Sequence, residues 1–246
     1  KVFFQRFPEL YSFIFKLLHQ AEQKVQVQVK NTKLHPLLLL LNRLYNSNSD
    51  EESSIKLTEF IPIITSCSGC VELQTRILCA KFIANNTPPS SYAILSNIKS
   101  CREDVNMTGN AKHGKLLIIL HLCKRDCLTE SESSEIIKEF YELIKTSKNF
   151  DGLLPTAMDV MIECYSKFWA VGKIDAELTQ ILVMILSLEM KLGSFSNALM
   201  SQKMLALNLL QFHFHDNFEW IFNLKNCDFY KQQVKLNCLL LILDFD

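Results

Sequence analysis

The sequence predicts an all-α fold, a HEAT/armadillo-type α-solenoid made of stacked antiparallel helix pairs. Two compositional observations favour it: Gly 6 and Pro 6 are few among 246 residues, and 48% of the residues are hydrophobic. Helix breakers are therefore scarce and a large core can form. The third observation is a helical hairpin predicted over residues 57–85, whose apolar face only a neighbouring unit can cover.

The N-terminal third of the chain contains two helices and a connector. Apolar residues recur at helical spacing in residues 1–23, and Pro8 is tolerated in the first turn of that helix. Residues 24–30, KVQVQVK, alternate Val with polar residues, a strand pattern without a partner strand, so we expect an extended connector. A further helix over residues 34–45 starts around Pro36.

The hairpin over residues 57–85 follows an acidic, Ser-rich segment, residues 46–54, which we expect to be a solvated loop. Its first helix carries a Pro, and its turn passes through Ser68 and Gly69. The spacing of the second helix is similar to that of a HEAT repeat, and Arg76 is expected along the seam between repeats.

Helices continue along the rest of the chain. A short helix over residues 88–101 is capped at Ser90 or Ser91, and a buried helix over residues 110–127 is capped by Thr108 or Asn110. The remaining predicted helices span Glu132–Thr146, Leu153–Phe168, Ile174–Lys191, Ser194–Phe214 and Phe229–Leu243.

Four motifs occur in an order that resembles the thyroid adenoma-associated protein (THADA-like) family. They are FF-x-RFPELY, LHP followed by RLY, FIP with a downstream R-x-x-x-A helix, and N-x-x-HG-x-LL, which together cover about residues 1–125. The motif positions singled out are Arg6, Pro8, His35, Pro36, Arg76, Asn110, His113 and Gly114.

This resemblance implies a non-catalytic scaffold that assists an FtsJ-like methyltransferase in 2'-O-methylating the ribose of tRNA position 32 in the anticodon loop. S-adenosylmethionine would then be bound by the partner, and this chain would hold no cofactor. The family's Arg-Arg-Ser-Ala-Gly signature is missing here, which is a departure from the family pattern. The alternative is a general protein-interaction scaffold, for example one that binds an endoplasmic-reticulum calcium pump.

Charge predicts only a local candidate surface. Lys+Arg 26 equal Asp+Glu 26, so the chain lacks the global positive field that drives unspecific nucleic-acid binding. A polar corner before the buried helix gathers positive charge, and we expect it to contact tRNA or a partner. The alternative is a plain structural role, in which His113 is bonded within a loop and Gly114 allows the close approach of another helix. The members of the corner are Lys99, Arg102, Lys112, His113 and Lys115, and Glu103 and Asp104 lie next to them in sequence.

No pattern in the sequence predicts catalysis or a metal site. Cys67-Ser-Gly-Cys70 and His213-Phe-His215 lack further ligands at compatible spacing, and the nine Cys are expected to be reduced, buried thiols. No apolar run is long enough to span a bilayer, so we expect a cytoplasmic protein. We expect residues 1–246 to be one solenoid segment of a longer protein, with family-matching repeats over 1–127 and further helical repeats over 128–246.

Overall fold

The computed structural model describes residues 3–44, 57–104, 106–126 and 128–146, together with 153, 156–157, 159–161 and 163–164. All of them fall within the first of the two units into which the chain divides, Lys1–Gly172. These residues form helices and no strand, which confirms the all-α prediction. The elements are α1 (Phe3–Arg6), α2 (Pro8–Gln26), α3 (Leu34–Leu41), η1 (Leu57–Phe60), α4 (Ile61–Cys67), α5 (Leu73–Asn86), α6 (Ser91–Glu103), α7 (Gly109–Arg125) and α8 (Glu130–Thr146). The helices predicted over 174–191, 194–214 and 229–243 lie outside the described residues, as does most of 153–168.

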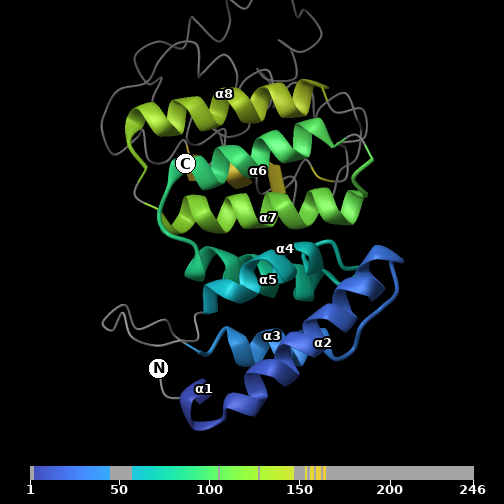
Figure 1. Ribbon diagram of the computed structural model, residues 1–246. Helices are drawn as coiled ribbons and strands as arrows, with labels where there is room; N and C mark the ends of the chain where they lie inside the picture. The colour runs from blue at the N-terminus through green and yellow to red at the C-terminus, as the bar shows by residue number, and fades with distance from the viewer. Residues whose placement is uncertain are drawn as a thin grey trace, which may run out of the picture. The chain divides into compact units, whose positions relative to one another are not determined.

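The helices form two layers, and successive helices along the chain are added alternately to one layer and to the other (Figure 1). Layer A contains α2, α4, α6 and α8, with α2 packed on α4 and α6 packed on α8. Layer B contains α3, α5 and α7, each packed on the next. Contacts of α4 with α5 and of α6 with α7 join the layers. This is the stacked-pair solenoid that the sequence predicts.

The repeat period becomes visible in the side-chain bonds that join successive units. Bonds within one layer link residues separated by 36 to 43 positions along the chain. The pairs are Asn42 with Leu78, Arg76 with His113 and His113 with Thr156 in layer B, and Ser91 with Glu132 and Arg102 with Glu139 in layer A. Because the separation drifts by several residues, the sequence shows no fixed period even though the units are equivalent in space.

Several predicted helix starts are confirmed. Pro8 lies in the first turn of α2. Ser90 caps α6, since its Oγ accepts a hydrogen bond from the Tyr92 amide at 3.2 Å. Of the two candidates for α7, Thr108 is the cap, because its Oγ1 accepts from the Ala111 amide at 3.3 Å. These residues satisfy amides that the first turn of a helix leaves without a partner.

The extended connector predicted over residues 24–30 is wrong in its first half. Helix α2 continues to Gln26, and the chain turns only at Gln28, which has φ 53°. Val25 is buried with Ala21 and Leu18, four and seven positions earlier. Burial at helical spacing therefore overrides the alternating pattern, because a lone strand here would leave this apolar face without its core.

Helix α8 begins two residues before the predicted start. Thr129 and Glu132 form a capping box, in which Thr129 Oγ1 accepts from the Glu132 amide at 3.3 Å. In return, Glu132 Oε2 accepts from the Thr129 amide at 2.9 Å. Helix α1 was not predicted at all. In the described part of the chain, no helix is both long and apolar enough to cross a membrane.

Two of the four family-like motifs meet in the core of the first units. The ring of Phe60, in the FIP motif, is fully buried. Phe4 and Tyr11, from the FF-x-RFPELY motif, have ring centroids 6.0 and 5.1 Å from it. These motif residues therefore hold α1, α2 and η1 together through aromatic packing.

Candidate functional site: the joint at the start of α7

The residues of the N-x-x-HG motif pack against the turn between α4 and α5. A Cβ added to Gly114 would lie 2.0 Å from the carbonyl oxygen of Ser68, which is a backbone atom and cannot move aside cheaply. Beside it, a Cβ on Gly69 would lie 3.2 Å from the Cβ of Ala111. The glycine of the motif is therefore required by a close approach of α7 to this turn.

Arg76 holds the same turn from the other side. Its side chain is only 8% exposed. One terminal nitrogen donates to the carbonyls of Cys70 at 2.7 Å and Val71 at 2.9 Å, and to Asn110 Oδ1 at 2.9 Å, while Nε donates to His113 Nδ1 at 3.1 Å. The guanidinium thus joins α5 and its preceding turn to α7, the seam position that the sequence predicts for Arg76.

His113 uses both ring nitrogens inside the protein. Arg76 Nε carries a hydrogen and can only donate, so Nδ1 of His113 accepts and the proton sits on Nε2. Nε2 lies 2.9 Å from Thr156 Oγ1, to which it donates. Burial, together with the positive charge of Arg76, lowers the pKa of His113 to about 4. At neutral pH His113 is therefore an uncharged bridge between α7 and the residues that follow α8.

Asn110 extends the chain of bonds to the turn after α2. Its Oδ1 accepts from Arg76, and its Nδ2 donates to Gln28 Oε1 at 2.8 Å. Gln28 Nε2 in turn donates to the carbonyls of Val25 at 2.9 Å and Gly69 at 3.3 Å. We call residues 68–71 together with Gln28, Arg76, Asn110, His113 and Gly114 the α7 joint. Through it, polar bonds link three successive helix pairs.

The other motif positions fall into two places. His35 and Pro36 lie in the first turn of α3, and His35 Nδ1 is 3.4 Å from Thr75 Oγ1, next to Arg76. These residues therefore share one end of layer B with the α7 joint. Arg6 and Pro8 lie instead where α1 meets α2 in layer A. Ser68 was expected in the turn of the hairpin, but the sequence offered no signal for the approach of its backbone carbonyl to Gly114. It also offered none for Gln28, whose side chain bonds to Asn110, 82 positions away.

The predicted polar corner is assembled, but part of its charge is already paired. Lys99 lies 3.8 Å from Glu103, and Arg102 lies 2.6 Å from Glu139 of α8. Lys115 donates to Ser100 Oγ of α6. Lys112 is half-buried beside the same helix. With His113 committed to the α7 joint, Lys112 and Lys115 are the members that remain as candidates for contact with tRNA or a partner.

The C-x-x-C segment belongs to the α7 joint and has a packing role. Burial raises the pKa of the Cys67 thiol to about 12 and also raises the pKa of Cys70. Cys67 donates to the Leu18 carbonyl at 3.9 Å, and Cys70 donates to the Glu72 carbonyl at 3.5 Å. Neutral buried thiols are poor nucleophiles and poor metal ligands. Among the residues that the structure describes, no group of three or more His, Cys, Asp or Glu could hold a metal ion; His213 and His215 lie outside them.

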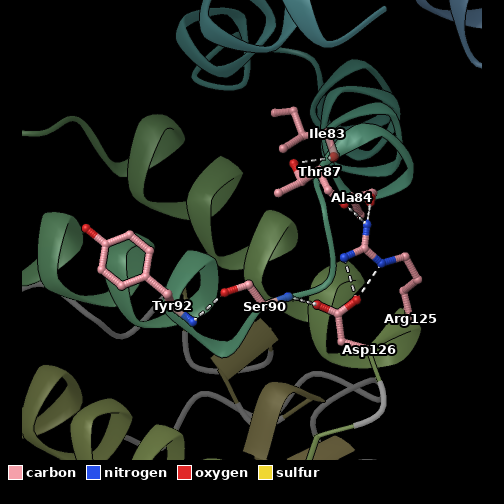
Figure 2. A network of polar contacts seen from close by, with 7 residues as sticks. All are labelled: Ile83, Ala84, Thr87, Ser90, Tyr92, Arg125 and Asp126. Atoms are coloured by element: carbon pink, nitrogen blue, oxygen red, sulfur yellow. Dashed lines mark hydrogen bonds and ion pairs between the residues drawn. The ribbon is translucent and has the colours of Figure 1, made fainter. Parts of the chain in front are cut away.

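A second arginine network closes the opposite end of α7 (Figure 2). Arg125 donates to the carbonyls of Ala84 and Thr87 at the end of α5 and lies against Asp126. Asp126 Oδ2 accepts from the Ser90 amide at 3.3 Å. A cation here interacts favourably with the free carbonyls at the C-terminus of α5. Helix α7 is therefore fixed to α5 at both ends.

Successive helix pairs, joined by side chains that bridge one unit to the next, define the chain as a helical-repeat protein. Residues 1–122 match the family described as Trm732, C-terminal TPR repeats. Among similar proteins is the tRNA (32-2'-O)-methyltransferase regulator THADA of Mus musculus, 32% identical over 158 residues, which cover 59% of this chain and 8% of that protein. The human protein of the same name is 33% identical over 49% of this chain and 7% of its own length. The Drosophila melanogaster protein is 26% identical over 50% of this chain and 8% of its own length.

The chain belongs to the THADA family, and its similarity lies in the Trm732-type C-terminal repeats. It spans less than a tenth of the length of these relatives. No solved structure matches the chain.

Proposed function

We propose that this chain is a non-catalytic part of a scaffold that regulates tRNA methylation. In this proposal it assists an FtsJ-like methyltransferase, which 2'-O-methylates the ribose at position 32 in the tRNA anticodon loop. S-adenosylmethionine is bound by the methyltransferase, and this chain contributes helical-repeat surface. The observation that carries the proposal is family membership, because the relatives are named as regulators of a tRNA (32-2'-O)-methyltransferase.

The α7 joint supports a structural contribution over a catalytic one. His113 is uncharged and has both nitrogens bonded, and the thiols of Cys67 and Cys70 are buried and protonated. A general base needs a free lone pair and a nucleophilic cysteine needs a thiolate, whereas the imidazole is bonded at both nitrogens and the thiols are protonated. The motif residues in the joint therefore fix the positions of helices that present a binding surface.

Recovery of the partner from cells tests the proposal. The complete protein, tagged and purified, is expected to recover an FtsJ-like methyltransferase, and its removal is expected to lower 2'-O-methylation at tRNA position 32. Recovery of an endoplasmic-reticulum calcium pump without any methyltransferase, and unchanged methylation, would instead support the general interaction scaffold.

The polar corner has a separate test, because its part in this function is a prediction. Lys112→Glu with Lys115→Glu is expected to weaken tRNA binding by the assembled complex, most clearly at low salt. Arg102→Gln is the matched control, since Arg102 is already paired with Glu139. Unchanged tRNA affinity and unchanged methylation in the double variant would show that the corner is only the start of a helix.

A further inference from the structure

Charge is segregated between the two layers of the stack. The three helices of layer B, α3, α5 and α7, contain no Asp or Glu in their sequences. Acidic residues of the described α-helices lie in layer A, where α8 alone has five Glu. Helices α5 and α7 contain six Lys and Arg and no acid, so layer B is positively charged.

Exposed cations occur once per unit along layer B. Arg43 follows α3, Lys81 lies in α5 and Lys124 lies near the end of α7, and all three side chains are exposed. Inter-unit bonds bring them level with one another. Asn42, next to Arg43, donates to the Leu78 carbonyl at 3.1 Å, one turn before Lys81. Neighbouring packed helices are about 8–10 Å apart, which sets the spacing of the cations across the layer.

On α7, Lys124 and its neighbour Arg125 lie at the same height along the helices as Lys81 on α5. Arg125 donates to the carbonyl of Ala84, one turn after Lys81 (Figure 2). His121 lies near both lysines: burial lowers its pKa to about 4, and the charges of Lys81 and Lys124 add to this effect. The two ammonium groups therefore lie close enough to act on one imidazole, and their charges reinforce each other.

Uncharged donors and acceptors flank these cations. A cavity of about 620 Å³ at the ends of α3, α5 and α7 is lined by Asn42, Asn85, Asn86, Thr87 and Arg125, among others, and none of its described lining residues is a carboxylate. Within the described residues no carboxylate pairs with Arg43, Lys81 or Lys124. Among the described residues that follow α8 are two acids, Asp159 and Glu163, and Asp50, Glu51 and Glu52 lie in a part of the chain that the structure does not describe.

We propose that Arg43, Lys81 and Lys124, here called the basic row, bind the phosphate backbone of the tRNA. This rests on the proposed function for the identity of the RNA and adds a surface to it. The row lies on the side of layer B opposite the start of α7, away from the polar corner. Exposed lysines bind phosphates as point charges, without reading bases, and so position an RNA for an active site held elsewhere.

The surroundings of the row favour RNA over an acidic protein. Specific protein interfaces have an apolar, desolvated core. The large exposed apolar residues of layer B are Leu39 and Leu40 beside Arg43 and Leu73 at the start of α5, and none lies in α7. Around Lys81 and Lys124 the surface is therefore basic and polar without an apolar centre, as phosphate contact requires.

The test measures how salt affects binding of an unmodified tRNA transcript with C32 to the complete protein. Lys81→Gln with Lys124→Gln is compared with Lys16→Gln with Lys24→Gln, which removes two exposed cations from α2 in layer A. Each lost phosphate contact is expected to reduce the slope of log K against log salt by about 0.7–0.9. The layer B pair should therefore lose about 1.4–1.8 and the layer A pair nothing. Adding Arg43→Gln should reduce the slope further.

Three results overturn the proposal. The first is an unchanged slope in the layer B pair, and the second is an equal loss in the layer A pair. The third is unchanged tRNA binding with reduced recovery of the methyltransferase, which would assign the row to an acidic protein partner. Failure of the proposed function is distinguishable, because the wild-type protein would then recover no methyltransferase whatever the basic row does. Thermal melts of both pairs should match the wild type, which excludes loss of fold.

Discussion

The two ends of α7 are fixed to α5 by arginines that work in opposite directions. At the start of α7, Arg76 of α5 reaches forward to Asn110 and His113. At the end of α7, Arg125 reaches back to the carbonyls of Ala84 and Thr87. The first guanidinium binds uncharged acceptors, whereas the second also lies against the carboxylate of Asp126.

This difference explains why only one end carries a recognisable motif. At the start of α7 the acceptors are side chains, and the approach to Ser68 admits only glycine at position 114. Residue identities are therefore constrained at fixed spacing. At the other end the acceptors on α5 are backbone carbonyls, which any residue supplies. Two arginine contacts that both fix an end of α7 can therefore produce a recognisable sequence motif at one end and none at the other.

The largest expected effect is steric and belongs to the start of α7. Gly114→Ala places a Cβ against the Ser68 carbonyl and should lower the free energy of unfolding by about 3–5 kcal/mol, as overpacking against backbone does in severe cases. Gly109→Ala is the matched control, because a Cβ there meets nothing within 4 Å. Chemical denaturation of both variants measures the difference. Equal stability of the two would show that α7 can shift away from the turn.

Removing each arginine compares the two ends directly. Arg76→Ala should cost about 2–4 kcal/mol, because it strips the donors from two carbonyls, an amide oxygen and an imidazole nitrogen. Arg125→Ala should cost a similar amount, since it also removes the cation beside the buried Asp126. Denaturant midpoints measure both. A negligible loss of stability in either variant would show that its arginine does not hold that end of α7.

Acid should weaken the packing of α7 through two desolvated histidines, His113 in the α7 joint and His121 further along the helix. The pKa of His113 is about 4 in the folded chain against about 6.5 when unfolded, so between these values the unfolded chain binds more protons. Stability is therefore retained above pH 6.5 and is lost as the pH falls towards 4. His121 behaves alike, with a folded pKa of about 4. Melting temperatures recorded from pH 7.5 to 4.5 should fall, and His121→Gln should make the fall shallower; a flat profile would contradict the buried, neutral state of both rings.

The smallest effect is expected at the half-buried lysines of the polar corner. Lys112→Glu with Lys115→Glu should change the free energy of unfolding by about 0.5 kcal/mol or less, because the substitutions leave the buried joint intact. Thermal melts measure this. A large loss of stability would mean that the Lys115 bond to Ser100 helps to hold α6 on α7, and would complicate any reading of tRNA binding by that variant.

The sequence identified many of the residues that form the α7 joint, but it did not predict how they are arranged in space. Arg76, Asn110, His113 and Gly114 were singled out, and Arg76 was placed on the seam between repeats. Their convergence on the Cys67–Cys70 turn was not predicted, because helical spacing describes one helix and not its neighbour. His113 was assigned to a charged corner, with a bonded role inside the protein as the alternative. The structure shows the bonded role, with Arg76 and Thr156 at its two ring nitrogens, and these partners were not predicted.

By itself the sequence determined what depends on neighbours a few residues away: the helical fold, two candidate caps each for α6 and α7, of which the structure uses Ser90 and Thr108, and Pro8 in the first turn of α2. Such features follow from local backbone geometry and from the spacing of apolar residues. Tertiary structure alone decided the rest. Val25 is helical because a core lies beside it, the carbonyl that excludes a side chain at Gly114 comes from another unit, and Lys81 and Lys124 both act on His121 because α5 packs on α7. These contacts depend on which helix surfaces meet when the units stack. Because the repeat length varies, the sequence does not show which residues of successive units will lie side by side.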